Sequence, residues 1–142
     1  MAQKLPLVFA CSGCSHAGRL AYDVALELDR RGVAEMSCLA GIGGRITHFL
    51  RQLPGRDVWI IDGCPIECAR GVFEQVRGRA DAHICLHELG VRKNAGAPPD
   101  GDMERLLDGA LQQVSAQQEP CGADSLKQNP NVEPEGECDE CS

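Results

Sequence analysis

The sequence is poor in the residues that mark several familiar classes of protein. Aromatic side chains make up only 4% of its 142 residues, so the core must be built from Leu, Ile, Val and Ala. No apolar run approaches the roughly 18 residues that a membrane-spanning helix needs. The short apolar stretch near the N-terminus merges into a predicted strand, so we do not interpret it as a signal peptide. We therefore expect a cytoplasmic protein without a membrane partner.

Basic residues are also scarce, with 14 Lys and Arg against 21 Asp and Glu and a net charge of −7. Much of the negative charge lies from Gln118 onward, where Lys127 is the one basic residue. Nucleic-acid binding normally requires a basic surface, so we expect no nucleic-acid partner, and no feature identifies a protein partner. The sequence has no GxGxxG, Walker or HExxH pattern, and GIGG at 41–44 is predicted to be a turn or loop.

Cysteine, in contrast, is abundant. Nine cysteines in a chain of this size, without an export signal, do not indicate a disulfide-stabilised miniprotein, and their odd number excludes complete internal pairing. In a reducing compartment such cysteines more often bind metal or carry out redox chemistry. The cysteines are therefore the candidate functional residues.

Apolar residues recur at strand and helix spacings in alternation along the chain. Strands are predicted at 4–11, 33–40, 58–61 and 82–86, and helices at 17–31, 46–53, 65–76 and 102–117. This alternation predicts an α/β fold with a parallel sheet covered on both faces. Because crossovers between parallel strands are right-handed, we expect a small Rossmann-like or flavodoxin-like three-layer sandwich with strand order 2-1-3-4.

The pattern ends near the last predicted helix. We expect residues 1–117 to form one α/β metal-binding domain and residues 118–142, rich in Pro, Gly, Asn and Glu, to be a flexible acidic tail. The tail contains Cys121 and a CxxC pair, Cys138 and Cys141. This pair is interpreted as a metal-capturing site, a redox pair or incidental thiols, and these alternatives remain open.

Five other cysteines lie at or just beyond the carboxyl ends of predicted strands. Cys11 ends the first strand and Cys14 lies in the loop after it, Cys38 lies near the end of the second, and Cys64 and Cys68 follow the third. Ligands of doubly wound sheets gather beyond the carboxyl ends of the strands. In the order 2-1-3-4 these three strand ends are neighbours. We call these five residues the rim cysteines and expect them to share one edge of the sheet.

The segment VWIIDGCPIECARG (58–71) suggests how two of them are arranged. Pro65 suits the first position of a helix, which would make Cys64 the N-cap residue. Residues four apart share a helix face, so Cys64 and Cys68 are expected to face the same ligand. The positive end of the helix dipole would favour their thiolate forms.

Other residues near the rim have plainer interpretations. A single cysteine on an apolar strand is usually a small core residue, and we expect this of Cys85. His16, His48, His83 and His87 could each bind zinc. His16 and His48 lie near the predicted rim, but surface or packing roles fit all four better than metal ligation. Asp62 is predicted to shape the turn after the third strand. The rim cysteines themselves could bind a metal or cluster, exchange disulfides or be inert.

Three motifs resemble one family. FACSG (9–13), CLAGIGGR (38–45) and DGCPIECA (62–69) together are similar to the DGC-domain family, named for its Asp-Gly-Cys motif, over roughly residues 6–115. That family is described as zinc-binding through four characteristic cysteines. The resemblance implies Cys11, Cys38, Cys64 and Cys68 as zinc ligands. It implies a metal-binding protein in metal homeostasis, sensing or delivery.

The sequence departs from that family's pattern at Cys14 and in the cysteine-containing tail. Cys14 is a fifth candidate ligand, so the choice of four among five stays open. CSGCS (11–15) also resembles the first cluster loop of nickel–iron hydrogenase small subunits, which implies an iron–sulfur cluster and electron transfer as an alternative. A thiol or persulfide redox carrier using Cys11 and Cys14 is a third hypothesis. Whether the protein is an enzyme stays open.

Overall fold

A computed structural model of the protein describes residues 3–94 and 102–118. The elements run in the order β1 (Leu7–Ala10), α1 (His16–Arg30), β2 (Glu35–Met36), α2 (Leu39–Gly43), α3 (Thr47–Leu50), β3 (Val58–Asp62), α4 (Cys68–Gln75), β4 (Ala82–Cys85), the 3₁₀ helix η1 (Leu86–Leu89) and α5 (Asp102–Gln118). Strands and helices therefore alternate as the apolar spacing predicts.

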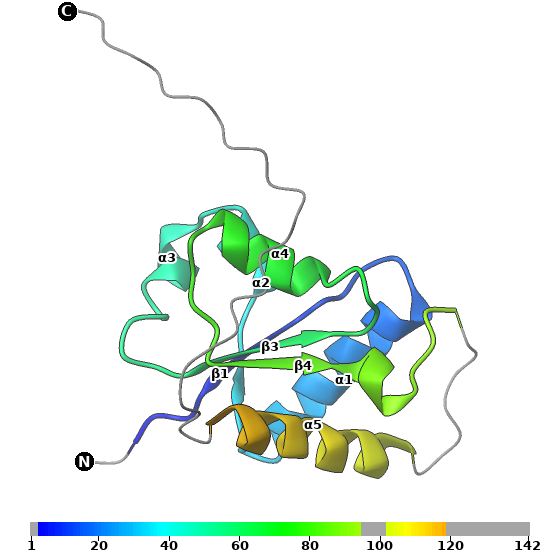
Figure 1. Ribbon diagram of the computed structural model, residues 1–142. Coiled ribbons are helices and arrows are strands. Elements are labelled where there is room, and N and C mark those ends of the chain that lie inside the picture. Colours follow the sequence, from blue (N-terminus) through cyan, green and yellow to red (C-terminus); the bar gives the residue numbers. More distant parts are fainter. Residues whose placement is uncertain (1–2, 95–101, 119–142) are drawn as a thin grey trace, which may run out of the picture.

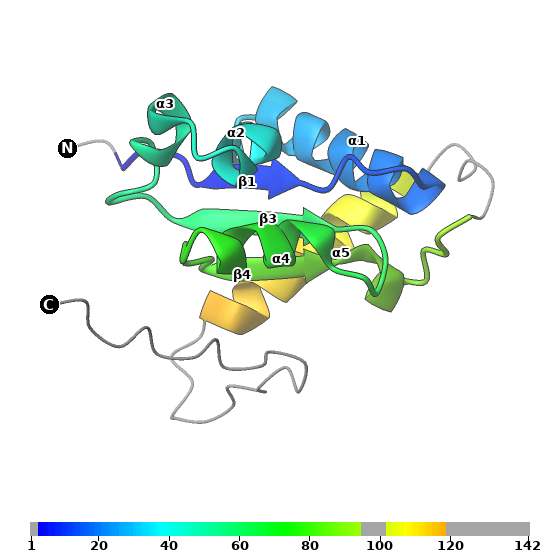
Figure 2. The ribbon, with the colours of Figure 1, turned by 90° about the horizontal axis from the view of Figure 1, so that it is seen from above.

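The strands form one parallel sheet in the order β2-β1-β3-β4, which confirms the predicted topology. Figure 1 shows α2, α3 and α4 on one side of this sheet and α1 and α5 on the other. Figure 2 shows the layers from above, with α4 lying across β3. The sequence-based expectation of a three-layer α/β sandwich is therefore correct.

Two apolar clusters hold the layers together. Alternate residues of a strand point to opposite faces, so Val8 and Ile61 join the cluster beneath α1 and α5. Leu7 and Ile60 join the cluster beneath α2 and α4. Fully burying one such aliphatic side chain stabilises the fold by about 1.5–3 kcal/mol. The sheet is thus a fixed platform for the loops that leave its edges.

Helix α1 begins where its sequence supplies a cap. Ser15 precedes it in an extended conformation, and its side-chain oxygen accepts a hydrogen bond from the N–H of Gly18 at 3.1 Å. Such a cap stabilises a helix by about 1 kcal/mol. The buried stripe of α1 includes Leu20, Val24 and Leu28. The cap fixes the loop between β1 and α1, which carries Cys11 and Cys14.

The segment after α1 differs from the prediction. We expected a strand over 33–40 and a turn over 41–44, but β2 covers only Glu35–Met36 and α2 begins at Leu39. The sulfur of Cys38 accepts a hydrogen bond from the N–H of Gly41 at 3.3 Å and caps this helix. Cys38 therefore belongs to a helix start and not to a strand.

The predicted helix start at Pro65 is wrong. The N–H of Glu67 donates to the carbonyl oxygen of Cys64 at 3.2 Å, so residues 64–67 form a turn, and α4 begins at Cys68. Proline suits the second position of such a turn as well as the first turn of a helix. Cys64 is therefore not the N-cap residue and does not share a helix face with Cys68.

None of the helices described at 3–94 and 102–118 is both long enough and apolar enough to cross a bilayer.

Candidate metal centre

Polar side chains gather on one face of the sheet at its carboxyl edge. In β4, Ala82 and Ile84 pack beneath α1 and α5, so His83 and Cys85 point to the opposite face, toward α4. Asp62, the last residue of β3, is the register partner of Cys85. The alternation of the strands thus aligns an acid, an imidazole and a thiol on neighbouring strands.

Cys11 lies beside this group, where β1 ends. Its N–H donates to the carbonyl oxygen of Ile61 at 2.9 Å, which extends the pairing of β1 and β3 to their ends. Burial raises the pKa of the Cys11 thiol, and negative charge at Cys68, Asp62 and Cys64 raises it further. The structure therefore brings three of the five rim cysteines into one electrostatic neighbourhood.

The other two rim cysteines are exposed. Cys14 lies in the loop before α1, and Cys38 caps α2. Helix α2, which Cys38 caps, packs against α4, which begins at Cys68. His16 begins α1, and its Nε2 is buried without a hydrogen-bond partner among the described residues. His48 is exposed in α3 and contacts Gln52 at 3.3 Å.

Asp62 organises the centre. Its carboxylate is 1% exposed. It accepts hydrogen bonds from the N–H groups of Ala69 at 2.8 Å and Arg70 at 3.1 Å, and lies 2.8 Å from Nε2 of His83. The first N–H groups of a helix have no partner within the helix, so Asp62 supplies the cap that Glu67, the residue before α4, does not. One side chain thus joins β3, β4 and α4.

Glu67, His83 and Cys85 form a compact set of potential metal ligands. One atom from each lies within 4.8 Å of the others, and this is the one such group within residues 3–94 and 102–118. The Cys85 sulfur is 3.6 Å from both ring nitrogens of His83 and 3.8 Å from Oε1 of Glu67. Burial and the nearby carboxylates of Glu67, Glu88 and Asp62 raise the pKa of Cys85 to about 12.

This set was missed by reasoning from the sequence. Cys85 is buried, as expected of a core residue, but it contacts polar groups instead of only apolar ones. The period-two pattern of AHIC (82–85) carried the necessary signal, because it places His83 and Cys85 on one face. The third member, Glu67, comes from another element, and no local pattern assigns it to this face.

Two glutamines of α5 fix the position of β4. The side-chain amide of Gln117 bonds both the N–H and the carbonyl of His83, each at 2.8 Å. Gln113 does the same for Cys85, at 2.9 and 3.3 Å. These bonds occupy backbone groups that an edge strand would otherwise leave open. They hold the backbone from which the imidazole and thiol project.

Glu67 is held in an unusual conformation. Its φ of 56° and ψ of 49° are left-handed, a region that costs a residue with a side chain about 1–2 kcal/mol. Its carboxylate pairs with Arg70 at 3.0 Å, and Arg70 also pairs with Glu74 at 3.0 Å. Strained residues cluster at functional sites. The turn thus positions the carboxylate of Glu67 above β4 at an energetic cost.

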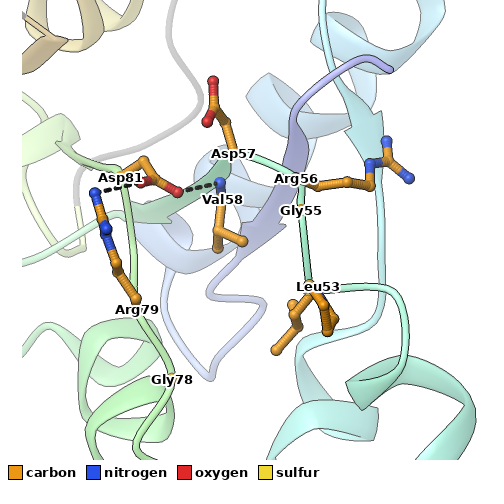
Figure 3. A pocket seen from close by; sticks show the side chains of 9 residues that line it. Leu53, Gly55, Arg56, Asp57, Val58, Gly78, Arg79 and Asp81 are labelled. Carbon is orange, nitrogen blue, oxygen red and sulfur yellow. Dashed lines mark hydrogen bonds and ion pairs between the residues drawn. The ribbon is translucent and has the colours of Figure 1, made fainter. Parts of the chain in front are cut away.

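A separate pocket of about 510 Å³ lies at the other end of the sheet, where β3 and β4 begin. Figure 3 shows Arg79 paired with Asp81, which also accepts the N–H of Val58. Arg56, on the other side, pairs with Glu35 at 2.7 Å. Both arginines of the pocket are thus already paired with carboxylates, and no rim cysteine lines the pocket. The candidate centre is therefore at the opposite, carboxyl edge.

Comparison with known proteins identifies the family. A family model described as the DGC domain matches residues 7–110. The chain belongs to the DGC-domain family. It is also 44% identical over 105 residues to a protein of Pseudomonas aeruginosa (strain PAO1) named Anaerobic and virulence modulator AnvM. That match covers 72% of this chain and 80% of the relative. No solved structure matches the chain.

Each residue of the Asp-Gly-Cys motif of this DGC-domain protein has a distinct place. Asp62 caps α4, and Cys64 starts the turn that leads to it. A Cβ on Gly63 would overlap the carbonyl oxygen of Ala17, so only glycine lets this loop approach the start of α1. The motif therefore joins the two loops that carry Cys11 and Cys64. The family and the Glu67, His83 and Cys85 group are compatible with metal binding.

Proposed function

We propose that this DGC-domain protein binds zinc through cysteine thiolates at the carboxyl edge of its sheet. The ligands are Cys11, Cys38, Cys64 and Cys68, with Cys14 as the fifth candidate. Zinc accepts four thiolates in a closed tetrahedral site, and a bound cation offsets the repulsion between neighbouring thiolates. The protein would then act in metal homeostasis, sensing or delivery.

The observation that carries this proposal is the junction of β1 and β3. The bond from the N–H of Cys11 to the carbonyl of Ile61 brings the exits of the two strands together. Cys64 and Cys68 leave the second of these exits, and their charges act on the Cys11 thiol. Thiols from distant parts of the sequence thus share one neighbourhood, which is the donor chemistry that a thiophilic metal needs.

The related protein favours a regulatory use of the metal. Its name describes a modulator of anaerobic behaviour and virulence, and the two chains are 44% identical over most of their lengths. A thiolate site responds to both metal supply and oxidation, because only the deprotonated, reduced sulfur binds. Among the three roles, we therefore propose sensing as the one that this relative supports.

The test is elemental analysis of the full chain purified without oxygen, with an absorption spectrum of the same sample. We expect bound zinc, no colour and a marked loss of zinc in Cys64→Ser. Iron together with acid-labile sulfide in the sample would mean that the site holds an iron–sulfur cluster and not zinc. A metal-free protein with reactive thiols would overturn metal binding and favour a thiol or persulfide carrier.

A further inference from the structure

We propose that Glu67, His83 and Cys85 form a second metal site, distinct from the rim cysteines, for a divalent cation of the zinc class. It would offer one oxygen, one nitrogen and one sulfur donor. The site goes beyond the proposed function, because it uses none of the residues assigned to the rim site.

The three donor atoms lie within 4.8 Å of one another, close enough to be gathered around one ion. With a zinc–sulfur bond of about 2.3 Å and zinc–nitrogen and zinc–oxygen bonds of about 2.0–2.2 Å, the sulfur of a tetrahedral site lies about 3.5–3.7 Å from its other ligand atoms. The Cys85 sulfur is 3.6 Å from the nitrogens of His83 and 3.8 Å from Oε1 of Glu67. Because the sulfur is equidistant from the two ring nitrogens, binding one ion at Nδ1 requires the Cys85 side chain to rotate toward that nitrogen, together with a movement of the Glu67 side chain.

Asp62 prepares His83 for this role. An ionised carboxylate only accepts hydrogen bonds, so its contact of 2.8 Å with Nε2 requires that this nitrogen carry the proton. The lone pair of Nδ1 is then available to a cation. Metal-binding histidines usually have such a carboxylate partner on the second nitrogen. Gln117 fixes the backbone of His83 at the same time.

The site is also accessible and can release Glu67 from its present partner. The side chain of His83 is 19% exposed and that of Glu67 is 29% exposed, while Cys85 is buried beneath them. When the Glu67 side chain rotates toward a bound cation and leaves Arg70, Arg70 keeps its ion pair with Glu74. Three protein ligands leave a fourth position open, which suits the capture or transfer of an ion better than its permanent storage.

Co²⁺ titration of the full chain under anaerobic conditions tests the inference, because its absorption reports thiolate coordination. The starting protein carries serine at Cys121, Cys138 and Cys141, so that tail thiols do not contribute. Replacing all five rim cysteines (Cys11, Cys14, Cys38, Cys64 and Cys68) by serine as well removes the rim site. We expect this protein still to bind one Co²⁺ ion. Further replacement by His83→Gln or Cys85→Ser should abolish that binding.

Glu67→Gln and Glu74→Gln provide the matched pair. Both remove a carboxylate that pairs with Arg70, but only Glu67 belongs to the proposed site. We expect Glu67→Gln to weaken Co²⁺ binding at least about tenfold and Glu74→Gln to leave it unchanged. Equal effects of the two variants, or no Co²⁺ binding once the rim site is removed, would overturn the inference. Binding that survives only at the rim would leave the proposed function intact.

Discussion

At the scale of single residues, Asp62 connects the fold to its candidate chemistry. It is buried, it caps α4 through Ala69 and Arg70, and it contacts His83. A buried polar group must keep its partners, because an unsatisfied one costs about 1–3 kcal/mol. The same carboxylate therefore stabilises the domain and orients a potential metal ligand.

Asp62→Ala is expected to lower the free energy of unfolding by about 2–4 kcal/mol, since it removes a helix cap and leaves buried N–H groups without partners. Urea denaturation in the presence of a chelator measures this loss independently of metal. Asp23→Ala, which breaks an exposed ion pair with Arg19 on α1, should cost no more than about 1 kcal/mol. Equal losses in the two variants would contradict the role assigned to Asp62.

Two glycines, only eight positions apart, should respond in opposite ways to replacement by alanine. Gly63→Ala would force a Cβ against the backbone of Ala17 and should destabilise the protein strongly, by about 3 kcal/mol or more. Gly71 lies in α4 with open space around its Cα, so Gly71→Ala should stabilise by about 0.5–1 kcal/mol. Thermal unfolding of both variants checks the pair; a tolerated Gly63→Ala would contradict the close loop contact.

At the scale of elements, sequence patterns predicted the strands and long helices better than the turns. The stripe of α5 and the buried run of β3 carry their own periodicity. Pro65 gives no such unambiguous signal, because proline suits both a turn and a helix start. The start of α4 is set by the side chain of Asp62, which caps this helix from the end of β3. That contact joins two elements and is absent from any local pattern.

The candidate site was predictable to a similar extent. Strand order and strand ends predict that Cys11, Cys64 and Cys68 lie near one another, and in the structure the charges of Cys64 and Cys68 act on the Cys11 thiol. Cys38 was assigned to a strand, but its thiol caps α2. His83 and Cys85 share a face of the sheet because they are two positions apart on one strand. Glu67 reaches them through a residue conformation in the left-handed region, which the local sequence does not predict. Tertiary contacts, and not local secondary-structure propensity, bring Glu67, His83 and Cys85 together.

The contact between α1 and α5 should respond to acid. Hydrogen bonds from Arg30 and Arg31 lower the pKa of Glu27 from 4.5 to about 2, and Arg31 also pairs with Glu104 of α5. A lowered pKa means that the folded state binds the proton less tightly than the unfolded state. The stabilising contribution is therefore present above about pH 4.5 and is lost as the pH falls toward 2.

Glu27→Gln should accordingly reduce the loss of stability between pH 5 and pH 2.5, as measured by chemical denaturation at each pH. The effect is expected to be small, because exposed ion pairs contribute little. Asp108→Asn, at an exposed position of α5, removes an equal charge and serves as the control. An acid sensitivity identical in the two variants would contradict the contribution of Glu27.

At the scale of the whole molecule, the two edges of the sheet differ in character. The amino edge carries a pocket whose arginines are paired with carboxylates. The carboxyl edge carries the thiols, the imidazole of His83 and the Asp-Gly-Cys loop. Ligands of such sheets gather at the carboxyl edge, and both proposed metal sites lie there. Their proximity through Glu67 and Cys68, which are adjacent in the chain, would let one loop serve both.

X-ray absorption at the zinc edge tests the central claim, thiolate binding at the rim, most directly. The sample is the full chain with Cys85→Ser and serine at Cys121, Cys138 and Cys141, loaded with one equivalent of zinc. Only the rim cysteines then offer several thiolates. We predict a shell dominated by sulfur at about 2.3 Å. A shell of nitrogen and oxygen alone, at about 2.0–2.2 Å, would contradict the claim that cysteine thiolates at this edge hold the metal.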